Sequence, residues 1–311
     1  MLRAIVLGAA AGGGFPQWNS AGPGCRRALA GDPAAPARSQ ASLAVSADGE
    51  RWVLLNASPD LRQQIIATPA LHPHPAPGEI RHSPIAAVVL TGAEVDTIAG
   101  LLTLRERHAF ALYGAPQALA VLAANPIFQA VNPAIVPRRP LPLEAPLALQ
   151  DAAGVPLGLT IEAFAVPGKV PLFLEDASGA DPGRAEEGET IGLRVAAGGE
   201  ALFFIPGCAA MTPALAARLE GAACVFFDGT LWRDDEMLRA GAGPKTGARM
   251  GHMSIDGPGG VIAAFARLGV RRRILIHINN TNPVLLADSA ERAAAVAAGW
   301  DVAEDGMEVT L

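Results

Sequence analysis

Cysteine is scarce in this sequence, and its distribution excludes a disulfide framework. The three cysteines among the 311 residues are Cys25, Cys208 and Cys224, and no Cys-x-x-Cys pair occurs. Isolated cysteines are typical of proteins in reducing compartments, where thiols stay reduced. We therefore expect a cytoplasmic protein without disulfide bonds.

Basic residues do not gather into a long stripe. Lys and Arg number 24 against 30 Asp and Glu, the formal net charge is -6, and the longest basic run is Arg271-Arg272-Arg273. A surface that binds nucleic acid needs clustered positive charge to neutralise the phosphates. We therefore expect no nucleic-acid partner.

Long apolar runs are also missing, although 50% of the residues are hydrophobic. No run approaches the ~20 residues that a membrane-spanning helix needs. The apolar start resembles a signal peptide only superficially, because it is short and Gly12-Gly13-Gly14 follows closely. We expect a first strand that enters a glycine turn, and no membrane partner. Aromatic residues make up only 5% of the chain, so Ala, Val, Leu and Ile should form most of the core.

Apolar runs alternate with helix-like segments along the chain, which predicts a layered α/β domain with buried strands. The predicted strands are residues 4–7, 40–45, 51–56, 85–90, 159–166, 190–195, 201–205, 223–227, 273–276 and 307–309. The predicted helices are residues 61–66, a segment that carries Arg105, Glu106 and His108, residues 116–123, a helix that begins at Thr212-Pro213, and residues 261–268 and 289–298. The acidic stretch 176–189 is predicted to be a surface loop. No linker divides the chain, so we expect one domain over residues 1–311.

Three predicted buried strands lead into side chains that can bind metals, namely Asp96, Asp228 and His277. The carboxyl ends of strands are where α/β folds assemble sites from separate loops. His252 lies in a glycine-containing loop and could complete a cluster of two histidines and two carboxylates. Such a nitrogen and oxygen ligand set suits Zn(II), Mn(II) or Fe(II).

A purely structural interpretation of the same residues stays open. Asp228 could cap the turn at Gly229, and Asp96 could be the acid at a helix N-terminus. His252 could lie on the surface, and His277 could be a hydrogen-bonded core histidine. Spacing alone does not decide between the two interpretations.

The stretch that follows strand 85–90 resembles a known metal loop. The metallo-β-lactamase superfamily has a loop of the form Thr-His-x-His-x-Asp-His-x-x-Gly-Leu, and the matching positions here are Thr91, Asp96, Gly100 and Leu101. The later order of Asp228, His252 and His277 also resembles that superfamily, especially its ribonuclease Z-like branch.

Over essentially its full length the sequence resembles the pyrroloquinoline quinone (PQQ) biosynthesis protein B family. The matching motifs are residues 12–19, residues 56–64, Pro206-Gly207-Cys208, Phe227-Asp228-Gly229-Thr230, Asp234-Asp235-Glu236-Met237, Met250-Gly251-His252-Met253 and residues 277–283. The resemblance implies an α/β fold of the metallo-β-lactamase type, which is a four-layer αββα sandwich of two mixed sheets. It also implies a role in making PQQ from a peptide precursor that contains Glu and Tyr.

The sequence departs from the superfamily at the metal loop. The three loop histidines fall on Gly92, Glu94 and Thr97, and the family that the chain resembles normally keeps the last of them. A hydroxyl is a poor ligand for these metals, so Asp96 lacks its usual neighbour. The residues left for one mononuclear divalent-metal site are Asp96, Asp228, His252 and His277, with Glu94 and Asn280 as further candidates.

The N-terminal zinc knuckle of that family, Cys-x-Cys-x-x-Cys, is also incomplete. Its positions are occupied by Ser20, Gly22 and Cys25, so one thiolate remains. A tetrahedral structural zinc cannot be held by a single cysteine. We predict that this zinc is absent and that packing of Phe15 and Trp18 holds the loop.

The enzyme hypothesis that the resemblance implies is an oxidation. An Fe(II) centre held by His252, His277 and Asp228 would activate O2 and hydroxylate the tyrosine ring of the cross-linked Glu–Tyr intermediate, with Zn(II) as the other possible metal. Asp96 would be a fourth ligand or a base. The residues expected to position the acidic substrate are Lys169, Asn279 and Asn280.

A hypothesis of a different class stays open, in which the chain is a carrier that binds PQQ or its precursor without turnover. Thr97 and the missing knuckle cysteines favour it. A hydrolase of the β-lactamase kind is less favoured, because a two-metal site would need more histidines. The chain could also form a homodimer, which the sequence does not decide.

Overall fold

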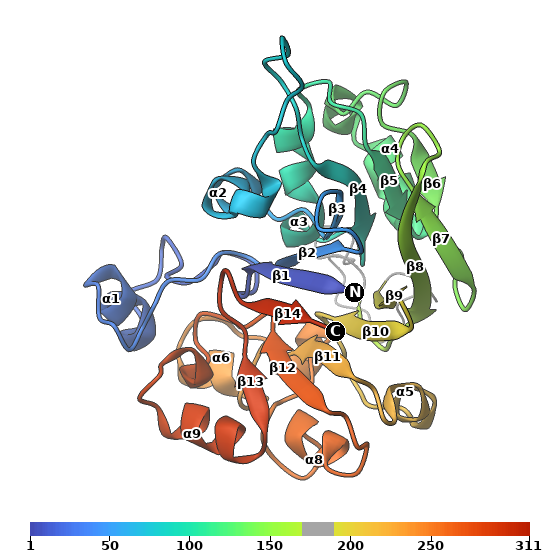
Figure 1. Cartoon of the computed structure of the whole chain (residues 1–311). Helices are drawn as coiled ribbons and strands as arrows, with labels where there is room; N and C mark the ends of the chain where they lie inside the picture. Colours follow the sequence, from blue (N-terminus) through green and yellow to red (C-terminus); the bar gives the residue numbers. More distant parts are fainter. Residues whose placement is uncertain (170–189) are drawn as a thin grey trace.

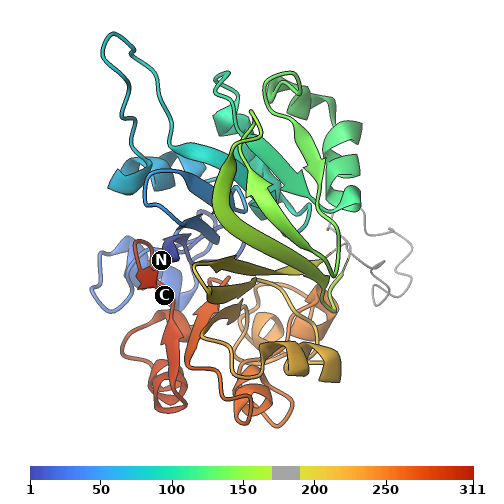
Figure 2. The same cartoon turned by 45° about the vertical axis from the view of Figure 1, so that its right-hand side comes forward.

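The computed structural model describes residues 1–169 and 190–311. The acidic loop predicted over residues 176–189 therefore lies outside the described residues. The described part forms two mixed β-sheets that pack face to face, with helices on the outer sides (Figures 1 and 2). This arrangement confirms the predicted four-layer αββα sandwich.

The first sheet has seven strands within the described residues. In spatial order they are β14 (Glu308–Thr310), β1 (Arg3–Gly8), β2 (Ser42–Ser46), β3 (Trp52–Leu55), β4 (Ile85–Leu90), β5 (Ala111–Gly114) and β6 (Arg138–Pro140). Strands β14 to β3 pair antiparallel, whereas β3 to β6 pair parallel. Because β1 and β14 are neighbours, the two ends of the chain lie side by side (Figure 1).

The second sheet also has seven strands in the described part of the chain. In spatial order they are β13 (Trp300–Val302), β12 (Arg272–Ile276), β11 (Cys224–Asp228), β10 (Glu200–Ile205), β9 (Ile191–Ala197), β8 (Pro156–Ala165) and β7 (Pro146–Gln150). Strands β10 to β13 pair parallel and β7 to β10 pair antiparallel. The parallel half brings the carboxyl ends of β11 and β12 together at one edge.

The main hydrophobic core lies between the two sheets. Strand β11 shows the alternation, because Phe226 belongs to the core between the sheets whereas Val225 and Phe227 belong to the core under the outer helices. All three side chains are fully buried. A strand covered on both faces reads as a continuous apolar run, which explains why these strands could be predicted from the sequence.

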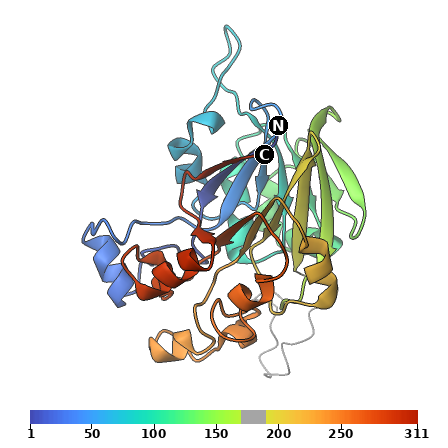
Figure 3. The ribbon, with the colours of Figure 1, turned by 60° about the horizontal axis from the view of Figure 1, so that its bottom comes forward.

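The helices lie outside the sheets (Figures 1 and 3). They are α1 (Pro23–Leu29), α2 (Leu61–Ala67), α3 (Val95–Ile98), α4 (Pro116–Ala124), α5 (Pro213–Leu219), α6 (Glu236–Arg239), α7 (Gly247–Met250), α8 (Val261–Phe265) and α9 (Ala290–Ala297). Short 3-10 helices are η1 (Pro69–Leu71), η2 (Ala99–Leu104), η3 (Pro126–Ala130) and η5 (Pro283–Leu285). Helix α5 begins at Pro213 as predicted, and α9 begins one residue later than predicted. Thr212 and Ser289 accept hydrogen bonds from main-chain N–H groups of the first turns of these helices. None of the helices in the described residues has the length and apolar character that crossing a membrane requires.

The prediction of a helix that carries Arg105, Glu106 and His108 is wrong. The chain forms only the four-residue α3 and the 3-10 helix η2, which ends at Leu104. Gly100 packs so closely on the loop after β3 that an added Cβ would lie 2.1 Å from the carbonyl oxygen of Ser58. This contact anchors η2 against the loop after β3, and residues 105–110 form no helix.

The N-terminal loop is held differently from the prediction. Phe15 is buried as expected, but Trp18 is 89% exposed and does not pack into the core. Main-chain hydrogen bonds join Phe15 to Arg38 in both directions, and the side-chain amide of Asn280 donates to Gln17 Oε1 over 2.6 Å. The loop therefore depends on hydrogen bonds and Phe15, and the role predicted for Trp18 is wrong.

Candidate metal centre

The predicted metal-binding side chains meet at the carboxyl ends of strands from both sheets. Asp228 is the last residue of β11, and His277 follows β12 directly. The parallel register pairs Asp228 with Ile276, which places His277 beside it at the edge of the second sheet. His277 has a left-handed backbone with a φ of 59°, which ends the strand at this point. Asp96 lies in α3, beyond the end of β4 in the first sheet.

His252 reaches the same place from the loop after α7. Gly251 caps that helix with a left-handed φ of 82°, a conformation that glycine adopts without steric cost. The main-chain N–H of Met253, the residue after His252, donates to the carbonyl of Cys208 over 2.8 Å. These two features reverse the chain and fix His252 next to Asp228.

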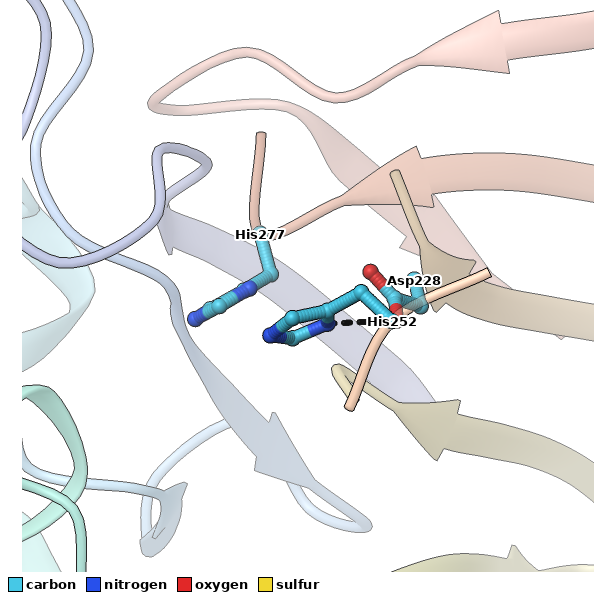
Figure 4. Close-up of side chains that lie close together, drawn as sticks. All are labelled: Asp228, His252 and His277. Atoms are coloured by element: carbon cyan, nitrogen blue, oxygen red, sulfur yellow. Dashed lines mark hydrogen bonds and ion pairs between the residues drawn. The ribbon is translucent and has the colours of Figure 1, made fainter. Parts of the chain in front are cut away.

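Asp228, His252 and His277 form the grouping of potential metal ligands found within the described residues. Each offers one ligand atom, and these atoms all lie within 4.8 Å of one another (Figure 4). The two imidazole rings are stacked, with centroids 5.3 Å apart and planes inclined by 22°. Two imidazoles and one carboxylate converge in a partly buried place, so the residues present fit a divalent metal such as Fe(II) or Zn(II).

Asp96 adds a second carboxylate on the other side of His277. The Nε2 atom of His277 lies 2.9 Å from Asp96 Oδ2, and each side chain is 17% exposed. Burial alone would raise the pKa of Asp96, but the hydrogen bond and charge of His277 outweigh it and hold this pKa below its ordinary value. Burial likewise acts to lower the pKa of His277, but Asp96 outweighs it and raises that pKa.

The Asp228 carboxylate is fully buried and accepts hydrogen bonds at both oxygens. Its Oδ1 accepts from the main-chain N–H of Thr230 over 3.0 Å and from the Thr230 hydroxyl over 2.6 Å. Its Oδ2 lies 2.9 Å from the main-chain nitrogen of Cys208 and 2.7 Å from His252 Nδ1. A metal that binds this carboxylate would share it with these donors, which fix its orientation.

The Cys208 thiol is not a candidate ligand at neutral pH. Burial, together with the nearby charge of Asp228, raises its pKa to about 12, so the sulfur keeps its proton. The contribution of this residue to the site is its main-chain N–H.

A cavity of about 590 Å³ opens above these side chains. Asp96, His252 and His277 line it, together with residues from both sheets. Gly12 lies against Asp96, since a Cβ added there would be 3.5 Å from the carboxylate oxygen Oδ2. This volume is in the range of pockets that bind small molecules.

Comparison with known proteins agrees with this architecture. Residues 51–278 match the family described as beta-lactamase superfamily domain. The chain is 63% identical to the coenzyme PQQ synthesis protein B of Gluconacetobacter diazotrophicus over 311 residues, which cover 100% of both sequences. It is 58% identical over 310 residues to the protein of the same name from Xanthomonas oryzae pv. oryzae, again with 100% of both sequences covered.

The chain belongs to the coenzyme PQQ synthesis protein B family.

Solved structures support the same assignment. The crystal structure of Zn(2+)-bound PqqB from Methylobacterium extorquens is 50% identical, covers 99% of this chain and 100% of its own, and has a TM-score of 0.93. A diphosphatase from the PhnP family has a TM-score of 0.68 at 19% identity, with 100% of this chain and 98% of that chain covered. The second likeness concerns the fold alone. Both agree with the predicted metallo-β-lactamase fold.

In this member of the coenzyme PQQ synthesis protein B family, Thr97 lines the cavity beside Asp96 and is 8% exposed. Glu94 and Gly92 line it as well. The superfamily positions of the three loop histidines thus face the cavity here, but none of the three residues supplies a nitrogen ligand.

The residues predicted to position a substrate separate into two groups. Lys169 and Asn279 line the cavity, and Lys169 Nζ lies 3.4 Å from Glu94 Oε1. Asn280 instead extends toward the N-terminal loop, where it contacts Gln17, and its Oδ1 lies 3.6 Å from the Cys25 sulfur. The catalytic role of Asn280 stays a prediction, and the structure places its amide in contact with that loop.

Thr230 is a residue of the site to which the sequence analysis assigned no role. Its Oγ1 lies within 3.1 Å of His252 Nδ1 and 2.9 Å of His277 Nδ1, in addition to its contact with Asp228. The sequence does contain a signal, because Thr230 stands two positions after the carboxylate that ends β11. A hydroxyl at that spacing can return to the carboxylate through a tight turn.

Proposed function

We propose that this chain works in PQQ synthesis as an Fe(II)-dependent hydroxylase that acts on the tyrosine ring of the cross-linked Glu–Tyr precursor. The observation that carries the proposal is the convergence of His252, His277 and the buried Asp228, with the two histidines lining a cavity. The names of its relatives, coenzyme PQQ synthesis protein B, support the pathway.

The ligand set supports iron chemistry over hydrolysis. Two histidines and one carboxylate leave coordination positions open, and such a set is typical of non-haem Fe(II) oxygenases. When bound, Fe(II) would supply the activation of O2. A hydrolytic two-metal centre would need more nitrogen ligands than the described residues bring together, since Gly92, Glu94 and Thr97 stand at the loop positions.

The proposed hydroxylation needs a reductant that supplies two electrons. One oxygen atom of O2 is inserted into an aromatic C–H bond of the tyrosine ring and becomes a hydroxyl group. The other oxygen atom leaves as water after accepting two electrons from a two-electron reductant and two protons. The ring carbon is thereby oxidised and O2 is reduced.

The contact of Asp96 with His277 supports its predicted place in the metal centre. Its Oδ2 lies 2.9 Å from His277 Nε2 and the residue lines the cavity, so the carboxylate stands where it could be a fourth ligand or a base.

Charge and shape of the cavity suit an acidic precursor. A carboxylate of the substrate would compete with Glu94 for Lys169, and the amide of Asn279 could donate to it or accept from it. The apolar side chains of Val95, Met237 and Met250 also line the cavity and would exclude water from the tyrosine ring.

The test begins with metal content. Protein reconstituted with iron under anaerobic conditions should retain about one iron per chain, and His252→Ala and His277→Ala should lose it. His74→Ala, in an exposed loop, is the control for loss of a histidine as such and should retain the iron. With O2 and a reductant, the loaded wild type should add one oxygen atom to a peptide that carries the Glu–Tyr cross-link, as measured by mass spectrometry.

Two outcomes would overturn the hydroxylase. One is a wild-type chain that takes up no metal. The other is an iron-loaded chain that leaves the cross-linked peptide unchanged. Tight binding of PQQ by a metal-free chain would support the carrier instead.

A further inference from the structure

Asn279 lines the cavity, and the fold holds it closely. It stands two positions after His277, and its main-chain N–H donates to the carbonyl of Thr230 over 3.0 Å. Thr230 belongs to the turn that follows Asp228, the last residue of β11. The main chain of Asn279 is therefore fixed beside the metal centre.

Both protons of the Asn279 side-chain amide already have acceptors. Its Nδ2 lies 2.7 Å from Thr281 Oγ1 and 3.1 Å from Met237 Sδ. A thioether sulfur only accepts, so the atom that faces Met237 is the amide nitrogen and not the oxygen. A threonine oxygen has two lone pairs, so Thr281 can accept from Asn279 whichever way its own proton points.

Thr281 is held in turn by the buried side chain of Glu236. Thr281 Oγ1 lies 2.6 Å from Glu236 Oε1, and Glu236 Oε2 accepts from the main-chain N–H of Trp232 over 2.7 Å. Glu236 is 8% exposed. The Asn279 amide is thus oriented by a chain of contacts that ends at a buried side chain and a main-chain group. If the amide turned over, its oxygen would face the sulfur of Met237 without a donor.

The carbonyl oxygen of the same amide remains for a ligand. Within the described residues, Asn279 Oδ1 accepts from Asn280 Nδ2 over 3.3 Å, and that nitrogen makes its shorter contact, 2.6 Å, with Gln17 Oε1. A carbonyl oxygen has two lone pairs, so one is left over. Of the two roles open to this amide in the cavity, accepting a hydrogen bond is therefore the one that its surroundings leave.

We propose that Asn279 is a specificity-determining residue that accepts a hydrogen bond from an O–H or N–H group of the substrate, with Thr281 and Glu236 as its positioning residues. A carboxylate cannot donate, so the substrate carboxylate binds at Lys169, which lines the same cavity. The cavity thus selects a molecule that carries both a carboxylate and a donor, such as a phenol hydroxyl or an amino group. The inference rests on the proposed function, because it takes the Glu–Tyr precursor as the molecule bound.

Two analogues of the cross-linked precursor locate the donor. One lacks the phenol hydroxyl of the tyrosine ring, and the other lacks the amino groups. Calorimetry without O2 or reductant measures the Kd of each analogue and of the unmodified precursor in the absence of turnover. Loss of one hydrogen bond to a fixed acceptor weakens binding by about tenfold, so the wild type should bind one of the two analogues about tenfold more weakly than the precursor.

Substitutions at Asn279 and Thr281 test whether this amide makes the lost contact. Asn279→Ala removes the acceptor, so the precursor and that analogue should bind with nearly equal Kd. Thr281→Val removes the hydroxyl that holds the amide and should also bring the ratio of the two Kd values close to one. Thr281→Ser keeps the hydroxyl and should retain most of the tenfold ratio. A purely structural role would weaken binding of both compounds and leave their ratio unchanged.

Lys169→Gln is the matched control. It removes the partner of the substrate carboxylate, which the precursor and both analogues share. All three compounds should therefore bind more weakly to Lys169→Gln, and the tenfold ratio between the precursor and the discriminated analogue should remain.

The inference is overturned if the wild type binds the precursor and both analogues equally, or if Asn279→Ala keeps the tenfold ratio. A Thr281→Ser protein whose ratio is close to one overturns the positioning role of the hydroxyl. If Thr281→Val does not fold, as judged by circular dichroism, Asn279→Ala and Thr281→Ser decide. A wild type that shows the ratio but leaves the precursor unchanged with iron, O2 and a reductant overturns the hydroxylase and supports this inference. A wild type that binds none of the three compounds contradicts both.

Discussion

Asp96 Oδ2 and His277 Nε2 lie 2.9 Å apart, and this contact joins the ends of strands from the two sheets. The residues are 181 positions apart in the chain. Asp96 follows β4 of the first sheet and His277 follows β12 of the second. The site is therefore complete only when the two sheets pack face to face, and a metal bound by both residues would connect the two halves of the sandwich.

Replacing Asp96 with Asn should weaken metal binding and reduce the stabilisation that the metal provides. Asn keeps the size of the side chain but removes the charge that attracts the cation and raises the pKa of His277. We expect Zn(II) affinity to fall about tenfold or more, because an amide is a weaker ligand than a carboxylate. Chelator competition measures the affinity, and thermal unfolding with and without Zn(II) measures the stabilisation.

The matched control for that substitution is Glu94→Gln, which removes another carboxylate that lines the cavity and that pairs with Lys169. It should bind Zn(II) nearly as well as the wild type. Equal affinities of Asp96→Asn and the wild type would exclude Asp96 as a ligand.

Replacing Thr97 with His should strengthen metal binding. Thr97 lines the cavity next to Asp96, and an imidazole is a far better ligand for Zn(II) or Fe(II) than a hydroxyl. We expect a Zn(II) affinity at least about tenfold higher than that of the wild type, provided that the ring reaches the metal. Thr97→Asn, of similar polarity but without an imidazole, is the control. An unchanged affinity for Thr97→His would show that the metal does not bind on the Asp96 side of His277.

Replacing Lys169 with Gln should weaken binding of an acidic substrate. The change removes a positive charge and leaves the negative charge of Glu94 facing the cavity. A hydrogen bond to a charged group contributes about 1.5–3 kcal/mol, so we expect KM to rise by about tenfold or more with a smaller change in kcat. Steady-state kinetics with the Glu–Tyr precursor measures both constants. Arg105→Gln, on the exposed connection before β5, should leave KM unchanged, and an unchanged KM for Lys169→Gln would exclude a contact with the substrate.

Glu236 should make the stability of the fold depend on pH near neutrality. Burial raises its pKa from 4.5 to about 7, although Thr281 and the main-chain N–H of Trp232 donate to it. The folded state therefore binds a proton more tightly than the unfolded state, and stability falls as the pH rises from about 4.5 to about 7. The shift corresponds to about 3 kcal/mol between the two ends of this range.

Urea unfolding at several pH values measures this effect. In Glu236→Gln the contribution of this side chain should become independent of pH, so the difference in unfolding free energy between wild type and variant should fall as the pH rises. Asp235→Asn, an exposed neighbour that pairs with Arg239, is the control and should retain the pH dependence of the wild type. Identical pH profiles for Glu236→Gln and the wild type would contradict the prediction.

Local pattern was enough to predict most strands and several helix starts. Strand β4 has the predicted bounds, and β11 lies one residue later in the chain than the predicted strand 223–227. Both could be predicted because a buried strand is a short apolar run with clear ends. The start of α5 at Thr212-Pro213 was predictable because a threonine hydroxyl can accept a hydrogen bond from the first turn of its own helix. Short elements with weak local preference were missed, such as the three-residue β13 and the four-residue helices α6 and α7.

The sequence by itself determined the fold class and the placement of Asp228 and His277 at strand ends, because both depend on residues close together in the chain and on the resemblance to a known family. Only the tertiary structure decided which polar groups meet. The contact of Asp96 with His277 requires two sheets to pack together, and the contacts of Thr230 depend on the register of β11 against β12. It also decided that Trp18 is exposed and that Asn280 contacts Gln17. Hydrophobic periodicity encodes which face of a strand is buried, but it carries no information on which distant side chains share the resulting interior.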